Sequence, residues 1–169
     1  VVEGGRGGQK GRLQVRCNVK KGDGTKTIST NRKARFNYEI LDTFEAGIVL
    51  TGTEVKSLRA GKCDLGESFA RIRNGEVFLL RSYIPKWTTA NAFDQHEERG
   101  TRKLLLHKRE IKKLLQKVQE KGLTLVPLRM YFKEGRVKVL LAVGRGKDKA
   151  DKRQTIKERD GKRAVSRMA

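Results

Sequence analysis

Apolar and polar residues alternate through the middle of the chain, a period-2 pattern typical of strands with one buried face. Across residues 38–50 the pattern is interrupted only at Asp42, and residues 126–132 and 137–143 alternate in the same way. We therefore predict three long strands, each with one face in the core. The expected core positions are Tyr38, Ile40, Phe44, Ala46, Ile48, Leu50, Val126, Leu128, Met130, Phe132, Val137, Val139, Leu141 and Val143.

Two short sequences are typical of tight turns between paired strands. Asn74-Gly75 separates the apolar segments 69–72 and 77–80, and residues 133–136 separate the last two long strands. Asn-Gly favours a two-residue turn with positive φ at both central positions, which matches the twist of the flanking strands. We predict a β-hairpin at each turn.

Two segments have helical periodicity. Residues 53–60 place Val55 and Leu58 inward and are followed by Gly61, which suits a helix end. Residues 107–121 carry apolar residues at i, i+3, i+4 and i+7. These stripe positions are Ile111, Leu114, Leu115 and Val118.

The order of these elements favours a mainly β fold. Many short antiparallel strands with few helices are typical of a small closed or nearly closed barrel. Pro127 has no N–H to donate to a strand ladder, so we expect a strand edge or a β-bulge there.

Positive charge is concentrated at the two ends of the chain. The net charge is +21, from 40 Lys and Arg against 19 Asp and Glu. Residues 1–30 and 144–169 hold few large apolar residues, so they cannot bury enough surface to offset chain entropy. We predict a disordered basic extension at 1–30, a folded domain at 31–143, and a basic tail at 144–169 that is disordered until it binds. The extension is Arg-rich and poor in acids, as in the remnant of an organelle transit peptide.

A charge this positive attracts polyanions, and nucleic acid first among them. A membrane partner is not expected, because no apolar run approaches the roughly 18 residues of a spanning helix. Cys17 and Cys63 lie far apart and match no metal or redox spacing, which predicts a reducing compartment and no disulfide.

One acidic cluster invites an enzymatic interpretation. It consists of Asp94, His96, Glu97 and Glu98. The cluster lies in an expected loop, without a second His at ligand spacing or a nucleophile motif. We therefore expect no catalysis, no metal and no cofactor.

Five longer runs of residues are more specific than composition or strand pattern. They are Phe-Glu-Ala-Gly-Ile at 44–48, Gly-Thr-Glu-Val-Lys-Ser-Leu-Arg-Ala-Gly-Lys at 52–62, Arg-Lys-Leu-Leu-Leu-His-Lys-Arg-Glu-Ile at 102–111, Lys-Gly-Leu-Thr-Leu-Val-Pro-Leu at 121–128, and Asp-Lys-Arg at 151–153. These runs resemble the small protein B family, the partner of transfer-messenger RNA. The resemblance covers residues 31–163 and keeps the order of every block.

The resemblance implies a small antiparallel β-barrel of the oligonucleotide-binding type with two or three flanking helices. It implies a monomer that binds the tRNA-like domain of transfer-messenger RNA and enters stalled ribosomes together with elongation factor Tu and GTP. The tail would then occupy the empty message channel, so that the stalled chain can be tagged. The bacterial cytoplasm or the plastid stroma is the expected compartment, and the N-terminal region and Phe36 favour a plastid or cyanobacterium-like protein.

The resemblance also implies two sets of contact residues. Those expected to bind the transfer-messenger RNA are Glu45, Gly47, Gly52, Lys56, Arg59, Lys62, Arg102, Lys103, Leu105 and His107. Those expected at the ribosomal decoding centre and message channel are Asn31, Arg35, Phe36, Gly146, Lys147, Asp151, Lys152, Arg153, Lys157 and Arg159. Many relatives have His where this chain has Phe36, which keeps a stacking face and loses the proton-donating edge.

One further departure from the family pattern and two alternative functions remain open at this point. Asp148 replaces a Lys that relatives commonly carry before the Asp-Lys-Arg run, which removes positive charge from the tail. A generic RNA-binding or ribosomal protein with a β-barrel core would share the charge and the strand pattern. A structural scaffold that binds no RNA is a third class.

Overall fold

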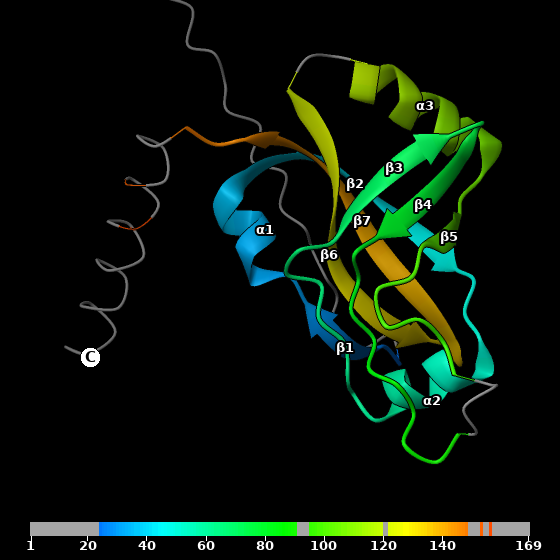
Figure 1. Ribbon diagram of the computed structural model, residues 1–169. Coiled ribbons are helices and arrows are strands. Elements are labelled where there is room, and N and C mark those ends of the chain that lie inside the picture. The colour runs from blue at the N-terminus through cyan, green and yellow to red at the C-terminus, as the bar shows by residue number, and fades with distance from the viewer. Residues whose placement is uncertain (1–23, 91–94, 120–121, 149–152, 154–155, 157–169) are drawn as a thin grey trace, which may run out of the picture.

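A computed structural model describes residues 24–90, 95–119, 122–148, 153 and 156 (Figure 1). The described part is mainly strand, with three helices on its outside. In chain order the elements are β1 (Lys26–Thr30), α1 (Arg32–Asn37), β2 (Tyr38–Ile48), α2 (Gly52–Arg59), β3 (Phe69–Arg73), β4 (Glu76–Leu80), β5 (Arg102–Leu105), α3 (Lys108–Gln119), β6 (Leu123–Lys133) and β7 (Arg136–Gly146).

The strands form one antiparallel sheet that closes on itself. Its order is β1-β6-β3-β4-β5-β2-β7, and a further pairing of β6 with β7 joins the ends into a ring. One side of β6 pairs with β7, while its other side pairs with β3 at Leu125 and with β1 beyond the bulge at residue 128. The predicted antiparallel barrel is therefore confirmed, with β1 added outside the ring (Figure 1).

Both predicted hairpin turns are present. Asn74 and Gly75 have φ of 50° and 73°, and Glu134 and Gly135 have the same values. Positive φ at both central residues is the type I′ arrangement that the Asn-Gly sequence predicts. The hairpins join β3 to β4 and β6 to β7.

Two bulges overturn the prediction that β2 and β6 each keep one apolar face in the core. The β2–β7 register shifts between Ile40 and Asp42, so Leu41 is an extra residue. An extra residue reverses which face each later side chain points to. Tyr38 and Ile40 therefore pack in a cluster outside the barrel, whereas Phe44, Ala46 and Ile48 pack inside it.

The second bulge lies between Pro127 and Arg129 in β6, as the missing N–H of Pro127 predicts. Val126 and Leu128 consequently join the outer cluster under α1, while Met130 and Phe132 point inward. β7 has no register shift against β6 or β2 of its own, and all four predicted positions from Val137 to Val143 lie in the interior core.

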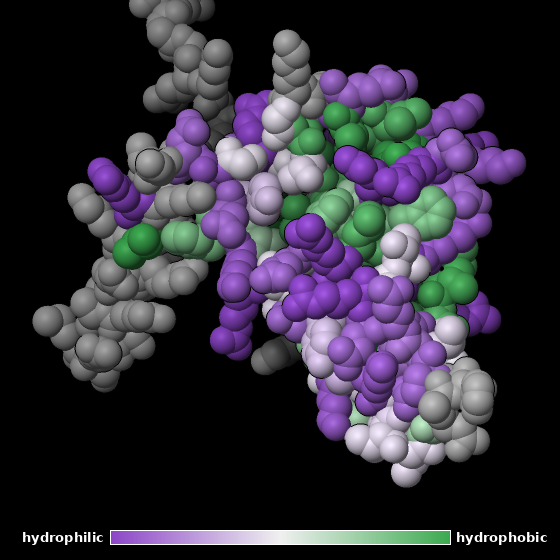
Figure 2. All heavy atoms as spheres, in the orientation of Figure 1, coloured by the Kyte–Doolittle hydropathy of each residue, from purple (hydrophilic) through white to green (hydrophobic). Residues whose placement is uncertain are grey.

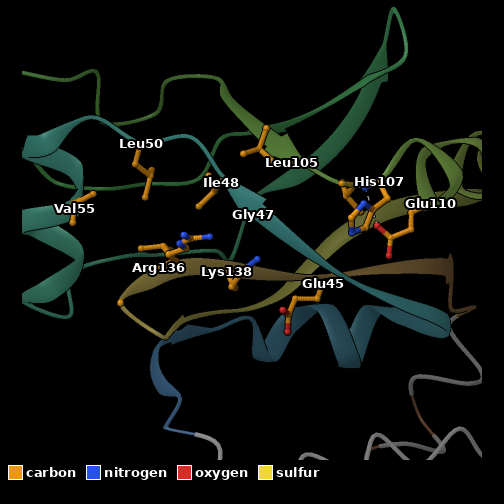
Figure 3. A pocket seen from close by; sticks show the side chains of 13 residues that line it. Glu45, Gly47, Ile48, Leu50, Val55, Leu105, His107, Glu110, Arg136 and Lys138 are labelled. Atoms are coloured by element: carbon orange, nitrogen blue, oxygen red, sulfur yellow. Dashed lines mark hydrogen bonds between the residues drawn. The ribbon is translucent and has the colours of Figure 1, made fainter.

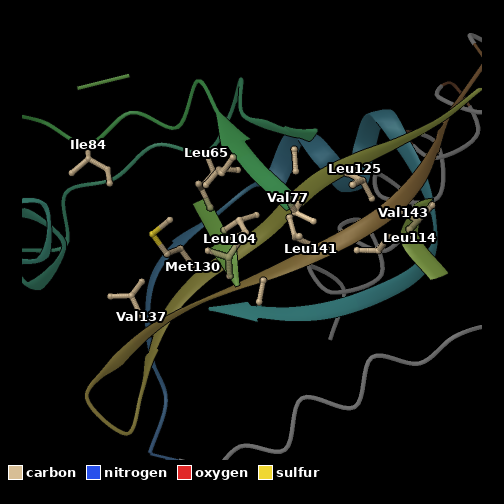
Figure 4. Close-up of a cluster of buried hydrophobic side chains, with 14 of the residues drawn as sticks. Leu65, Val77, Ile84, Leu104, Leu114, Leu125, Met130, Val137, Leu141 and Val143 are labelled. Carbon is tan, nitrogen blue, oxygen red and sulfur yellow. The ribbon is translucent and has the colours of Figure 1, made fainter. Parts of the chain in front are cut away.

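The interior core fills the barrel with aliphatic side chains (Figure 4). α3 and α2 lie at opposite ends of the barrel (Figure 1). From α3, Leu114 is fully buried, but Leu115 is 43% exposed, so the predicted stripe is one residue too wide. From α2, Leu58 is buried as predicted, whereas Val55 is only half-buried.

The N-terminal boundary differs from the prediction. Residues 26–30 form β1 and pair with β6, so the expected disorder of residues 1–30 is wrong for this segment. Residues 1–23 lie outside the described part. The predicted domain end at residue 143 is also early, because β7 continues to Gly146. No helix within the described ranges is long and apolar enough to cross a membrane.

Candidate nucleic-acid interface

An open groove of about 710 Å³ lies beside β2, between the start of α3 and the β6–β7 turn (Figure 3). It brings together four of the residues predicted to contact RNA: Glu45, Gly47, Leu105 and His107. They come from β2, from the end of β5, and from the residue that precedes α3. Residues 45 and 107 are far apart in the sequence, so only closure of the barrel places them on one surface.

Gly47 sits at the centre of this arrangement. It pairs with Leu105 of β5 on one side and with Lys138 of β7 on the other. A Cβ at Gly47 would lie 3.4 Å from the Cβ of Leu105, so a larger side chain here would press on Leu105. Leu105 is 52% exposed, and an exposed apolar side chain among cations is a suitable platform for a nucleobase or ribose.

Glu45 is the acidic group of the groove. The hydroxyl of Tyr131 donates to its Oε2 across 2.5 Å, and the Lys133 Nζ lies 3.3 Å from its Oε1. The Tyr131 hydrogen bond is the main cause that lowers the pKa of Glu45, and Lys133 and Lys138 lower it further. The carboxylate is therefore held ionised at the edge of a basic groove.

Two cations of the groove were missed by the sequence reasoning. Arg136 and Lys138 alternate along β7 with the buried residues Val137 and Val139. In Figure 3 their side chains and that of Glu45 form a row along β2 and β7. The signal was present in the sequence, because polar positions of a half-buried strand face outward, but nothing along the chain shows which outer face becomes a groove.

Arg102 was predicted to contact RNA, and the structure corrects this. Its side chain is 3% exposed and donates from Nε to Glu54 across 2.7 Å. It also donates to the backbone oxygens of Ser82, Glu97 and Gly100. Arg102 thus ties α2 and the loop before β5 to the barrel and does not form part of the outer surface.

The cations of α2 are placed as predicted. Lys56, Arg59 and Lys62 are all exposed on or just after this helix. A capping box between Thr51 and Glu54 begins the helix at Gly52. The side of α2 that carries Lys56 and Arg59 faces solvent, while the opposite side of the helix is buried. Hydrophilic side chains cover much of the surface at this end of the molecule (Figure 2).

Lys103 is half-exposed and forms an ion pair with Glu76 on the neighbouring strand β4. Any phosphate contact by Lys103 would have to compete with this carboxylate. His107 is exposed, and its backbone N–H donates to the Glu110 carboxylate across 3.0 Å, which caps α3.

Five members of the second predicted set lie on or beside α1: Asn31, Arg35, Phe36, Gly146 and Lys147. Arg35 and Phe36 lie on α1, and the end of β7 runs beside them: Gly146 pairs with Tyr38, and the Lys147 N–H donates to the Asn37 carbonyl. The root of the basic tail therefore begins next to α1. Of the remaining tail residues, Arg153 is exposed, whereas Asp151, Lys152, Lys157 and Arg159 lie outside the described residues.

Asn31 differs from the other members of this set because it is buried, with 3% of its surface exposed. Its side-chain oxygen accepts the Ala34 N–H and caps α1, and its Nδ2 donates to the Leu65 carbonyl across 2.7 Å. Asn31 thus orients α1 and offers no free surface to a partner.

The acidic loop considered as an enzyme site has a structural role. His96 is buried between the Thr53 hydroxyl and the Ile84 carbonyl, at 2.9 and 3.1 Å. Glu97 and Glu98 present their backbone oxygens to Arg102. Asp94 lies outside the described residues. Among the residues that the structure describes, no group of three His, Cys, Asp or Glu could hold a metal ion.

Comparison with known proteins gives a consistent family. The SmpB protein family model matches residues 28–169. An SsrA-binding protein of Trichodesmium erythraeum is 57% identical over 148 residues, covering 88% of this chain and 95% of the relative. One from Mesorhizobium japonicum is 56% identical over 152 residues, covering 89% and 95%.

A solved structure agrees with these relatives. It is described as "tmRNA-SmpB: a journey to the center of the bacterial ribosome", and its matching chain is 55% identical to this one. The match has a TM-score of 0.61 and covers 72% of this chain and 85% of the solved chain.

Proposed function

This chain belongs to the SmpB family, and we propose that it binds transfer-messenger RNA and acts with it in trans-translation on stalled ribosomes. The groove beside β2 is the proposed contact for the tRNA-like domain of that RNA. The surface around α1, with the basic tail that starts there, is the proposed contact for the decoding centre and the empty message channel.

The single observation that carries the first contact is the convergence of Glu45, Leu105, Arg136 and Lys138 on one groove. Folded RNA is recognised by phosphate contacts, by stacking of unpaired bases and by hydrogen bonds to ribose hydroxyls. The two cations supply phosphate contacts, Leu105 supplies an apolar surface, and the Glu45 carboxylate accepts hydrogen bonds that lysine cannot accept. The groove thus offers all three kinds of contact within one surface.

Binding of the purified protein to a transcript of the tRNA-like domain tests this contact. We expect it to be tighter than binding to duplex DNA of equal length at the same salt concentration. A generic RNA-binding protein would bind tRNA and the tRNA-like domain equally well, and a scaffold would prefer neither over DNA. Equal affinity for the tRNA-like transcript and the duplex DNA would contradict the proposal.

The tail needs a separate test, and the structure fixes where to cut the chain. Gly146 still pairs with β2 and Lys147 still bonds to Asn37, so a truncation that spares the barrel begins at residue 148. We expect deletion of residues 148–169 to change the affinity for the tRNA-like transcript by no more than about twofold, which corresponds to roughly 0.4 kcal/mol. Tagging of chains on stalled ribosomes should be lost. Full tagging by the truncated protein would refute a channel-filling role.

One further partner and the cellular compartment follow from the same proposal. Elongation factor Tu with GTP would reach the protein through the bound RNA and would contact none of the groove residues.

The similar relatives come from cyanobacteria and from other bacteria, which supports a bacterial cytoplasm or a plastid stroma as the compartment. Copurification followed by sequencing of the bound RNA would test the partner, and fractionation of source cells would test the compartment.

A further inference from the structure

Tyr131 is an unusual tyrosine for the outer face of a barrel, because only 3% of it is exposed. It lies on β6 opposite Lys138 of β7, and its hydroxyl reaches across β7 to the Glu45 carboxylate on β2. The guanidinium of Arg129 lies over its ring, 4.5 Å from the centroid. Tyr131 is therefore held on one side by Arg129 and on the other by Glu45.

From this arrangement we infer that Tyr131 is a positioning residue, whose hydroxyl fixes the Glu45 carboxylate so that it selects RNA groups bearing hydrogen-bond donors over bare phosphate. The inference rests on the proposed function of the groove and assigns a specificity role within it. Tyr131 itself is too buried to touch RNA, so it acts through Glu45.

The direction of the hydrogen bond supports this role. An ionised carboxylate only accepts, so the tyrosine hydroxyl must be the donor. The pKa of Glu45 is lowered chiefly by this hydrogen bond, and that of Tyr131 is raised by burial and by Glu45. Both shifts favour the pair of a neutral tyrosine and a charged carboxylate. The Lys133 ammonium, 3.3 Å away, and Lys138 face the same carboxylate and favour the same state.

The chemistry of the surface explains why orientation matters. Lys133, Lys138 and Arg136 attract any phosphate chain, and this attraction alone distinguishes nothing. A carboxylate among them repels phosphate but accepts from base amino groups and from the ribose 2′-hydroxyl, which DNA lacks. Lys133 already contacts both oxygens of this carboxylate, and without the Tyr131 hydroxyl that ion pair alone would set its orientation. Fixing it therefore contributes selectivity more than overall affinity.

The test compares two conservative variants of the full chain. Tyr131→Phe removes one hydroxyl and keeps the ring under Arg129. Tyr83→Phe is the matched control. The guanidinium of Arg99 lies over the Tyr83 ring, 5.9 Å from the centroid, but Tyr83 does not line the groove and belongs to none of the strands that form it. Both proteins are titrated with a tRNA-like-domain transcript and with duplex DNA of equal length.

We expect Tyr131→Phe to weaken binding of the transcript roughly three- to tenfold, the range for the loss of one typical intramolecular hydrogen bond. Its binding to duplex DNA should not change, and Tyr83→Phe should bind both probes like the wild type. Equal weakening for both probes, or no weakening at all, would overturn the inference.

The pH dependence supplies a readout that a merely structural tyrosine would not move. Affinity that needs an ionised Glu45 is lost as the pH falls through the pKa of that group. Because Tyr131 lowers this pKa, Tyr131→Phe raises it, and the loss should begin at a higher pH than in the wild type. Glu45→Gln should remove this transition. An identical transition in wild type and Tyr131→Phe would contradict the role.

Glu45→Asp keeps the charge but draws the carboxylate one methylene back from Tyr131. If Tyr131→Phe fails to fold, Glu45→Asp tests the same orientation, and it should show the same selective loss for the transcript. The two proposals fail differently. A wild-type protein without preference for the transcript refutes the function of the groove, whereas a preference that survives in Tyr131→Phe and Glu45→Asp refutes only the positioning role.

Discussion

The guanidinium of Arg102 donates to the carboxylate of Glu54 across 2.7 Å, with both side chains at least 93% buried. Glu54 also accepts the backbone N–H of Thr51 at the start of α2. One ion pair therefore joins the cation-bearing helix α2 to the strand β5 that leads to Leu105. This ion pair therefore fixes the position of the α2 cations relative to Leu105, so that two parts of the proposed RNA surface keep a constant arrangement.

Replacing Arg102 by Met should destabilise the fold strongly, because it leaves the Glu54 carboxylate buried without its cation. Breaking one side of a buried pair costs about 3–5 kcal/mol. The free energy of unfolding in urea measures this loss. Arg99→Met is the matched control: its pair with Glu67 is exposed on both sides, and such pairs contribute about 0–1 kcal/mol. Similar losses for the two variants would show that the buried pair has no special role.

Leu105 should contribute to RNA binding without contributing to stability. It is 52% exposed at the groove, so Leu105→Ala should change the free energy of unfolding by less than about 0.5 kcal/mol. Covering this side chain with RNA is worth about 1 kcal/mol, or roughly fivefold in affinity. Leu115→Ala is the control, because Leu115 is 43% exposed on α3 and does not line the groove. Equal affinities of the two variants for the transcript would rule out an apolar contact at Leu105.

Lys138 should form one phosphate contact. Replacing it by Gln should reduce the slope of log affinity against log salt concentration by about 0.7–0.9, the value for one released counterion. Lys112→Gln on the exposed side of α3 should leave the slope unchanged. Affinities measured at several salt concentrations separate the two variants, and an unchanged slope for Lys138→Gln would remove this residue from the interface.

Two glycines, one at the start of α2 and one just after its end, should respond differently to alanine. Gly61 follows the helix with φ of +75°, so Gly61→Ala should cost about 1 kcal/mol of stability. Gly52 begins the helix, and an added Cβ would meet no atom within 4 Å. Gly52→Ala should therefore be neutral or stabilise by up to about 0.5 kcal/mol. Thermal unfolding compares the two, and a loss at Gly52 equal to that at Gly61 would contradict the backbone argument.

Local chemistry allowed much of this protein to be predicted before the structure was known. The Asn74-Gly75 turn follows from the conformations that these residues favour, and Pro127 marks its bulge because it lacks an N–H. The charge distribution predicts a polyanion partner. Motif resemblance predicted Glu45 and Leu105, which the structure places on one groove.

The tertiary structure alone decided which side of β2 and of β6 lies inside along their whole length, and which predicted cations are outside. The bulge at Leu41 reverses the faces of β2, although the apolar alternation continues through it almost unbroken. Arg102 looks like its basic neighbours in sequence, yet the chain folds a loop and a helix over it. Burial and face depend on contacts between residues distant in the chain, so neither has a local signature. The same reason hides the pairing of Tyr131 with Glu45, which exists only because β7 lies between β6 and β2.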